Sequence, residues 1–562
     1  MDKYNSCQYF WSFADSCTGK RILTIIGYKI VYYIMKEIAL SLSGGGYRAA
    51  MFHLGTLAYL NRIKLSNGKR LLEVVNTIST ISGGSITGLW YMMHVCKGEN
   101  IDKCFKELFH KLSDVDLPQS VLNSFLDDKN SNDSLIRETI HFYDDVFFKG
   151  QTFGLLMNGA EHSHIHHFSA NGTDFSNGIA FRFQASRAIK NALPEFRYGF
   201  IGNNKHKIPR NLSAKIKLSE ILAVSSCFPG GFEPVVFPND FELYREKANQ
   251  DILQNIKPFE LMDGGIVDNQ GIEPLLLANQ QMSYDNSLAN GNKNYPCHDL
   301  IIVSDVASPD INPNRKIKFP LFLESMTIHK MYTIMICGFI LSLLTTIVLK
   351  ILSFSFFSGF FFAFSLLSLI MFIGGVFIKR SLVRKIRQFP ITFNIKKLNY
   401  LRFGKIMVMM QTRLSSLLVL AQSVFMKPIR QMRYNALYET PTWKHRLISN
   451  NVSELSSKGS WKWKKGFPDY LKPSEIMMEN SDKASNMGTT LWFSESEKKE
   501  GIPIALYSCG QYSICMNLLE YIGKIKIDST NITEAHKMLI ECEQQLVSDW
   551  KQFLKEPNFL IK

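Results

Sequence analysis

The sequence predicts an α/β fold with a mainly parallel central sheet, interrupted by a transmembrane hairpin of two long apolar helices. Three observations lead to this prediction. Short apolar runs at 37–43 and 74–81 are each followed by a glycine-rich turn and a helix-like stretch. A third run at 298–304 is almost continuously apolar, as in strands buried on both faces. The segment 331–378 holds a single charged residue, Lys350.

The first two runs define the repeating unit of the predicted sheet. The strand at 37–43 (EIALSLS) leads through three glycines into the helix-like YRAAMFHLGTLAYLNRI. The strand at 74–81 leads through the turn SGGS into a helix expected at 86–96. Strands that alternate with helices across short connections are typical of a parallel sheet covered by helices on both sides.

The hairpin is predicted from length and composition. Residues 332–349 are long enough to cross a hydrocarbon core as a helix, and residues 351–378 are longer than one crossing requires. The turn between the two helices is expected near Lys350. A buried hairpin of a soluble protein is the alternative, but the run FSFFSGFFFAF leaves no polar face for water. Basic residues flank both ends of the hairpin. They predict an integral membrane protein with its large domains on the cytoplasmic side.

The chain is expected to contain five segments. They are an N-terminal amphipathic segment at 1–36, a core at 37–310, a basic linker at 311–330, the hairpin at 331–378, and a C-terminal helical region at 379–562 that partly completes the core domain. Within the last segment, residues 449–486 are rich in Ser, Lys, Asn and Trp and are predicted to be irregular. The oligomeric state is left open.

A net charge of +15 calls for an anionic partner, and the common ones are nucleic acid and a phospholipid surface. The stretch SWKWKKGF at 460–467 interleaves aromatics with lysines, a pattern that both partners share. Because the same chain carries the hairpin, a membrane is favoured and no nucleic-acid partner is expected. A solvated loop with one packed tryptophan stays open as the alternative for 460–467.

Neither a metal nor another cofactor is expected. The ten cysteines include no CxxC pair, which argues against a zinc site or a compact disulfide framework and favours reduced thiols. His162, His164 and His166 alternate along the chain, so a strand would place them on one face, where they could ligate a metal. They lack a cysteine or a suitably spaced carboxylate, and a polar strand face or loop is the preferred interpretation.

Three glycine-rich stretches contain the candidate catalytic groups: SLSGGGYR at 41–48, GGSITG at 83–88 and LMDGGIVDNQG at 261–271. A serine hydrolase needs an activated hydroxyl, a base that takes its proton, and donors placed where the oxyanion develops. Each stretch can supply one of these three parts.

Gly44, Gly45 and Gly46 lie between a strand end and a helix N-terminus, where their amides can approach a charged oxygen. They are the predicted oxyanion hole, with Arg48 as a nearby cation. A phosphate cradle for a nucleotide is the alternative, but the Gly-Lys-Ser/Thr of a P-loop is missing.

Ser85 is the predicted nucleophile. It lies in Gly83-Gly84-Ser85-Ile86-Thr87, which is GxSxG with Thr87 in the last place. In such an elbow the serine adopts a strained conformation that exposes its Oγ, and Gly83, Gly84 and Thr87 form the turn around it. An N-cap serine is the alternative for Ser85.

Asp263 is the predicted base, because it ends an apolar run and is followed by Gly264 and Gly265, which would leave its carboxylate unobstructed. A turn aspartate is the alternative. His298 is the nearest candidate for a third member if the enzyme instead used a Ser-Asp-His triad.

Taken together, these stretches resemble the patatin-like phospholipase family. The resemblance rests on GGGYR, AAMFHLG, SGGSITG, AVSSCFPGGFEPV and DGGIVDNQG, in that order, and covers residues 37–309. The segment HFSANGTDFSNGIAFRF at 167–183 fits the family's middle strand pair. Departures are Thr87, where the family usually has glycine, and the hairpin.

The resemblance implies a three-layer α/β sandwich that hydrolyses acyl esters of lipids through an acyl-enzyme, without a metal. It implies a Ser-Asp dyad, carried over to Ser85 and Asp263, and a glycine-rich oxyanion loop, carried over to Gly44–Gly46 with Arg48. The expected protein is a membrane-anchored lipid acyl hydrolase of the phospholipase A or lysophospholipase type, acting on a phospholipid or another acyl lipid. A non-catalytic patatin-fold membrane scaffold or lipid-binding module is the alternative.

Overall fold

The computed structural model describes residues 38–117, 120–121, 134–187, 200–245, 249–290, 298–307, 326–386, 400, 402–420, 426–440, 443, 446–527 and 534–561. The amphipathic segment expected at 1–36 and most of the linker expected at 311–330 lie outside these ranges. The chain divides into two compact units. Unit 1 comprises Met1–Ile311 and Gln422–Lys562, and unit 2 comprises Asn312–Ala421.

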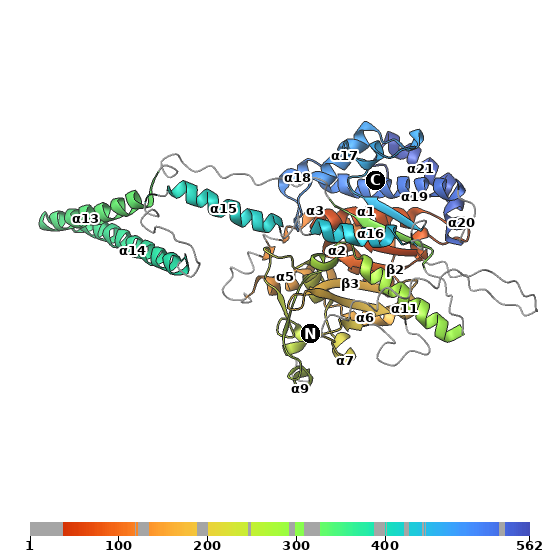
Figure 1. Ribbon diagram of the computed structural model, residues 1–562, viewed down its shortest axis with the longest axis horizontal. Coiled ribbons are helices and arrows are strands. Elements are labelled where there is room, and N and C mark those ends of the chain that lie inside the picture. The colour runs from red at the N-terminus through yellow and green to blue at the C-terminus, as the bar shows by residue number, and fades with distance from the viewer. Residues whose placement is uncertain are drawn as a thin grey trace, which may run out of the picture. The chain divides into compact units, whose positions relative to one another are not determined.

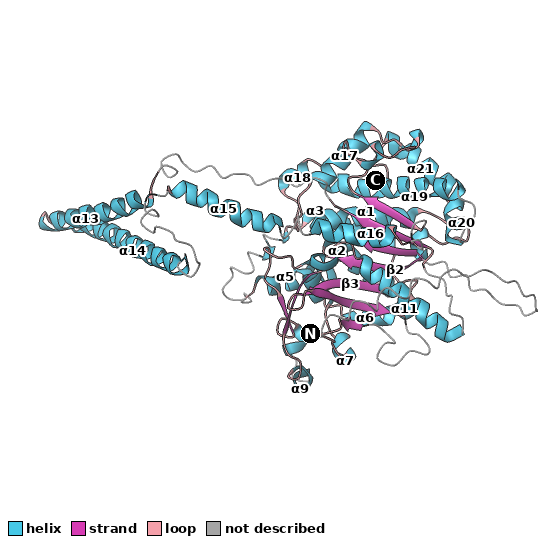
Figure 2. Ribbon diagram, in the orientation of Figure 1, coloured by secondary structure: helices cyan, strands magenta, loops and turns pink. Residues whose placement is uncertain are grey.

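Unit 1 is built on a mixed sheet of nine described strands (Figure 2). Five strands run parallel in the order β3 (His167–Asp174), β2 (Val75–Ile81), β1 (Ile38–Leu42), β8 (Leu300–Asp305) and β9 (Leu447–Asn451). Antiparallel pairing adds β4 (Ile179–Ser186), β5 (Phe200–Gly202), β7 (Phe259–Asp263) and β6 (Val235–Phe237) on the side of β3. The predicted parallel sheet is confirmed for the half that carries the first two glycine-rich turns.

Helices cover both faces of the sheet, so the unit has three layers (Figure 1). Strand β1 shows why, because its side chains alternate between two buried clusters. Ile38, Leu40 and Leu42 belong to the large core, and Ala39 belongs to a smaller cluster on the other face. A strand buried on both faces is mostly apolar, and β1 has this pattern except for the buried Ser41.

The helices of the two outer layers come from distant parts of the chain. The large core lies under α1 (Gly46–Arg62), α2 (Gly83–Lys97) and α19 (Ile502–Ile527), and α1 and α19 pack against each other. The smaller cluster lies under α11 (Ile272–Asn290) and α16 (Met426–Tyr438). The other α-helices of unit 1 are α3 (Ile101–Asp114), α5 (Leu135–Tyr143), α6 (Phe153–His162), α7 (Arg210–Ser213), α8 (Leu218–Ser226), α9 (Gln250–Leu253), α10 (Gly265–Asp268), α17 (Glu475–Asn486), α18 (Glu495–Lys499), α20 (Glu534–Glu541) and α21 (Glu543–Lys555).

The C-terminal region forms part of the sheet layer as well as the helical layers. Residues 449–486, predicted to be irregular, contain the end of β9, two short 3-10 helices and α17. The sequence LISNN of β9 has few apolar residues, so its pattern does not predict a strand. It is a strand because its backbone pairs in parallel with β8, from Ile301 opposite Leu447 to Asp305 opposite Asn451.

Unit 2 contains α13 (Ile328–Ile351), α14 (Ser355–Ile386) and α15 (Phe403–Val419). Helices α13 and α14 pack along each other. The turn between them lies at 352–354, close to Lys350, near which it is predicted, and Ser353 in this turn has a φ of 63°. The candidate spans His329–Ile351 and Ser355–Phe377 each contain an 18-residue window with a mean hydropathy of 2.4, of which 11% and 6% are buried. By length and composition, both helices are therefore long and apolar enough to cross a membrane.

Candidate active site

Ser82 occupies the sharp turn between β2 and α2. Its backbone has φ 50° and ψ −120°, a conformation that a non-glycine residue adopts only where the surrounding structure enforces it. Helix α2 begins at Gly83, three residues before the start expected at 86. The elbow residue is therefore Ser82, and Ser85 lies within the first turn of the helix.

The predicted elbow glycines explain why the turn is so tight. A Cβ on Gly83 would meet the backbone of Gly46, and a Cβ on Gly84 would meet the Leu42 carbonyl. Only glycine lets the start of α2 lie this close to the loop after β1. Thr87 lies farther along α2, where its hydroxyl donates to the Ala50 carbonyl at 2.7 Å, so it ties α2 to α1 without shaping the turn.

Asp263 meets Ser82 at this turn. The Asp263 carboxylate ends β7 and is hydrogen-bonded by the Ser82 hydroxyl. Its Oδ1 also accepts the Gly265 N–H at 2.6 Å. Burial raises the pKa of Asp263 to about 6, and these two hydrogen bonds oppose the increase. The group is therefore ionised at neutral pH but binds a proton more readily than an exposed aspartate, as a general base must.

Ser85 does not hydrogen-bond Asp263 in the described structure. Its hydroxyl lies 2.9 Å from Thr80 Oγ1 and 2.8 Å from Ser225 Oγ, and it is fully buried. Ser225 Oγ in turn donates to the Asn171 carbonyl and accepts the Ser82 N–H at 3.0 Å. The structure thus brings Asp263 together with Ser82 rather than with the predicted Ser85, which hydrogen-bonds the side chain that holds the Ser82 amide.

The glycine loop offers two free amides beside Ser82. The Gly44 N–H donates to the Asn269 carbonyl at 2.9 Å, whereas the amides of Gly45 and Gly46 have no partner among the described residues. Gly45 and Gly46 have φ values of 154° and 61°, in the region that favours glycine. A Cβ on Gly44 would lie 3.1 Å from Ser82 Cβ, so the loop and the hydroxyl are neighbours. Two of the three predicted oxyanion donors are therefore available.

Arg48 is directed elsewhere by its hydrogen bonds. Its Nη1 donates to the Met487 carbonyl at 2.7 Å, and its buried Nε has no partner in the part of the chain that the structure describes. Burial lowers the pKa of Arg48 to about 10, and Arg430 acts in the same direction. Arg48 joins α1 to the loop after α17, and no hydrogen bond links it to Ser82 or Asp263.

His298, the candidate third member of a triad, precedes β8 and so lies at the N-terminal ends of the parallel strands, whereas Ser82 follows the C-terminal end of β2. Its Nε2 lies 2.8 Å from Thr77 Oγ1, and burial lowers its pKa to about 3. His53 lies 2.9 Å from Ser304 Oγ and 3.0 Å from the Ser43 carbonyl. Within the described ranges, no histidine hydrogen-bonds Ser82 or Asp263.

The alternating histidines do not share a strand face. His162 ends α6, and β3 begins only at His167. His164 lies 2.9 Å from the Tyr91 hydroxyl, and His166 lies 3.2 Å from Arg187 Nη1. These separate partners leave the three side chains without a common centre.

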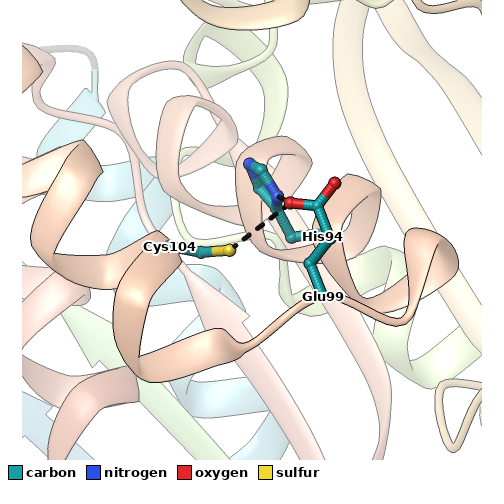
Figure 3. Close-up of side chains that lie close together, drawn as sticks. All are labelled: His94, Glu99 and Cys104. Atoms are coloured by element: carbon teal, nitrogen blue, oxygen red, sulfur yellow. Dashed lines mark hydrogen bonds and ion pairs between the residues drawn. The ribbon is translucent and has the colours of Figure 1, made fainter.

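One group of described side chains could hold a metal by distance alone: His94, Glu99 and Cys104 (Figure 3). Figure 3 shows that the imidazole and the thiol approach the same Glu99 carboxylate, with His94 Nδ1 at 2.6 Å and Cys104 Sγ at 3.8 Å. Burial raises the pKa of Cys104 to about 11, so the thiol stays protonated and donates. Buried His94 Nε2 has no partner, whereas ligating histidines usually donate their second nitrogen. The group acts as a hydrogen-bonded link between α2 and α3.

Comparison with known proteins gives one family match. A family model described as patatin-like phospholipase matches residues 40–276, which include Ser82, Asp263 and the glycine loop. The matched residues are similar to this family and make up less than half of the chain. Strands β8 and β9 and helices α16 and α19 lie outside the matched residues, so unit 1 extends this patatin-like domain with later parts of the chain.

Among the solved structures that are similar to this chain are two of one human enzyme. Human GIVD cytosolic phospholipase A2 matches with 12% identity and a TM-score of 0.29, over 49% of this chain and 44% of that one. The same human protein in complex with methyl gamma-linolenyl fluorophosphonate inhibitor and terbium chloride matches with 14% identity and a TM-score of 0.24, over 40% and 34%. This chain therefore spans less than half the length of either match. No curated protein sequence matches this chain.

Proposed function

We propose that this protein is a membrane-anchored lipid acyl hydrolase of the phospholipase A or lysophospholipase type, with Ser82 as nucleophile and Asp263 as base. One observation carries the proposal. The Ser82 hydroxyl, held on a strained turn, hydrogen-bonds a buried carboxylate beside the partnerless amides of Gly45 and Gly46. A nucleophile, a base and an oxyanion hole are the three parts that acyl transfer needs. The patatin-like domain supports a lipid ester as the substrate.

The proposed reaction has two halves. Asp263 takes the proton of Ser82 as Ser82 Oγ attacks the ester carbonyl, and the amides of Gly45 and Gly46 donate to the oxyanion. Collapse of the tetrahedral intermediate breaks the ester bond, and the leaving alcohol takes the proton from Asp263. Water, deprotonated by the same carboxylate, then attacks the acyl-enzyme and releases the fatty acid and Ser82.

The proposed membrane anchor is the pair α13 and α14. Their side chains are apolar and largely unburied within the chain, and hydrocarbon is the environment that suits such a surface. His329 and Lys330 lie at the start of the first span, and Lys379 and Arg380 follow the second. This bias supports a topology in which both flanks, and with them the patatin-like domain, face the cytoplasm.

Fluorophosphonate labelling tests the proposed mechanism. The purified full-length protein in detergent is expected to gain one covalent adduct, which peptide mapping assigns to Ser82, and to release free fatty acid from phospholipid or lysophospholipid micelles. An adduct on Ser85 would contradict the assignment of the nucleophile. A folded protein that neither reacts nor releases fatty acid would instead support the non-catalytic scaffold or lipid-binding module.

The anchor predicts a specific topology. The protein is expected to stay in membranes washed with alkaline carbonate. A glycosylation sequon on a Gly/Ser loop inserted at 352–354 is expected to be modified in microsomes, because that turn reaches the far side of the bilayer. The natural sequons outside the hairpin, among them those at Asn211 and Asn451, are the internal controls and stay unmodified. Release by carbonate, or modification of Asn451 alone, would contradict the topology.

A further inference from the structure

Asn269 connects the Asp263 loop to the oxyanion loop. It follows α10, six residues after Asp263, and its carbonyl accepts the Gly44 N–H at 2.9 Å. Its amide group also fills the space that a Cβ on Gly44 would occupy. Because Gly44 directly precedes Gly45 and Gly46, the position of Asn269 determines where the two free amides point.

Asn269 is itself held by Arg430 of α16. With its amide oxygen turned toward α16, Asn269 Oδ1 accepts a hydrogen bond from Arg430 Nε at 3.0 Å and a second from Nη2. Arg430 Nη2 also lies 3.6 Å from Oδ1 of Asp305, which ends β8 and is buried. Helix α16 packs against α10, and the Arg430 side chain is only 17% exposed. The guanidinium therefore bridges Asn269 and the end of a central strand.

We propose that Arg430 is a positioning residue that sets the oxyanion hole through Asn269 and Gly44. This inference rests on the proposed function. Its physical basis is the planar guanidinium, which presents several N–H groups in a fixed fork and can orient an amide and a carboxylate together, whereas a lysine ammonium is a point charge. Oxyanion donors are effective only when held close to the productive geometry. Arg430 lies outside residues 40–276, so the segment after the hairpin completes the site.

A purely structural ion pair between Arg430 and Asp305 is the competing explanation. The chain offers a matched control for it. Arg433 lies one turn farther along α16 and pairs with Glu273 of α11, and it has no hydrogen bond to Asn269. Removing either guanidinium breaks an ion pair of α16, but only the loss of Arg430 releases the oxyanion loop.

The test compares Arg430→Gln, Arg430→Lys and Arg433→Gln in the full-length protein. Arg430→Gln is expected to lower kcat for a short-chain ester and the rate of fluorophosphonate labelling by about 30- to 100-fold, with KM changed less than about threefold, because small displacements of catalytic groups cost this much. Arg430→Lys keeps the charge opposite Asp305 but recovers little of kcat. Arg433→Gln is expected to behave as wild type in both assays.

Hydrogen exchange gives a readout that does not depend on turnover. Peptides spanning residues 42–50 are expected to exchange several-fold faster in Arg430→Gln and at an unchanged rate in Arg433→Gln. The reason is that Asn269, whose backbone carbonyl accepts the Gly44 N–H, loses the guanidinium that holds its side chain. Unchanged exchange at 42–50, or full recovery of kcat by Arg430→Lys, would overturn the positioning role. An inactive and unlabelled wild type would instead overturn the proposed function, and the exchange data would still decide whether Arg430 holds the loop.

Discussion

Replacing Ser82 by alanine is expected to lower kcat for ester hydrolysis by about 10⁴- to 10⁶-fold, as the loss of a nucleophile does in serine hydrolases. Ser85→Ala is expected to keep activity within about tenfold of wild type. The difference arises because Asp263 hydrogen-bonds Ser82, whereas Ser85 hydrogen-bonds Thr80 and Ser225. The measurement is release of fatty acid by each purified variant under single-turnover conditions.

Ser85→Ala also serves as the matched control for Ser82→Ala. Both substitutions remove one hydroxyl from a buried site, Ser82 just before α2 and Ser85 in its first turn. Because loss of the Ser85 hydroxyl leaves Thr80 and Ser225 each with one hydrogen-bond partner fewer, Ser85→Ala is expected to lower the free energy of unfolding by about 1–2 kcal/mol. An inactive but folded Ser85→Ala variant, together with an active Ser82→Ala variant, would show that Ser85 is the nucleophile and contradict the assignment to Ser82.

Replacing Asp263 by asparagine is expected to lower kcat/KM by about 10³- to 10⁴-fold while making the protein more stable at neutral pH. Activity falls because an amide cannot take the Ser82 proton. Stability rises because the buried carboxylate is ionised above its pKa of about 6, and ionisation in an apolar site costs free energy. The measurements are kinetics and denaturant unfolding of both proteins at several pH values.

The sign of the pH dependence follows from the direction of the pKa shift. The pKa of Asp263 is 3.8 in its ordinary state and about 6 in the folded protein, so the folded state binds the proton more tightly. Wild type therefore loses stability relative to the asparagine variant as pH rises from about 4 to 6. The full difference, at most about 3 kcal/mol, persists above pH 6. Equal stability of the two proteins at pH 7.5 would contradict this burial.

The activity of wild type is expected to increase as Asp263 loses its proton, whereas its stability relative to the asparagine variant decreases. Only the ionised carboxylate can accept the Ser82 proton, so kcat/KM is expected to rise with pH through an apparent pKa near 6 and then to level off. An activity that is unchanged between pH 5 and pH 8 would argue against Asp263 as the base.

The difference between the predicted nucleophile Ser85 and the proposed nucleophile Ser82 shows where local sequence stops being informative. GGSIT at 83–87 and TISGG at 80–84 each retain one of the two glycines of GxSxG. Only the position at which β2 ends and α2 begins separates the two frames, and element boundaries are the least certain part of a sequence-based prediction. A helix start at Gly83 would have pointed to Ser82.

The sequence by itself determined the features that depend on nearby residues. Apolar runs followed by glycines specified the strand-turn-helix units around Gly44–Gly46 and Gly83, the carboxylate at Asp263 ended a buried strand, and an uncharged stretch specified two long apolar helices. Periodicity, steric freedom at glycine and hydrocarbon length are local properties, so they can be read from the chain directly.

Only the tertiary structure decided which of these groups meet. The pairing of Ser82 with Asp263, the addition of β9 beside β8, and the hydrogen bonds from Arg430 to Asn269 join residues separated by more than a hundred positions. Such contacts depend on strand order and on helix packing across the sheet, and these are set by burial of the whole core. No short stretch of sequence encodes that burial.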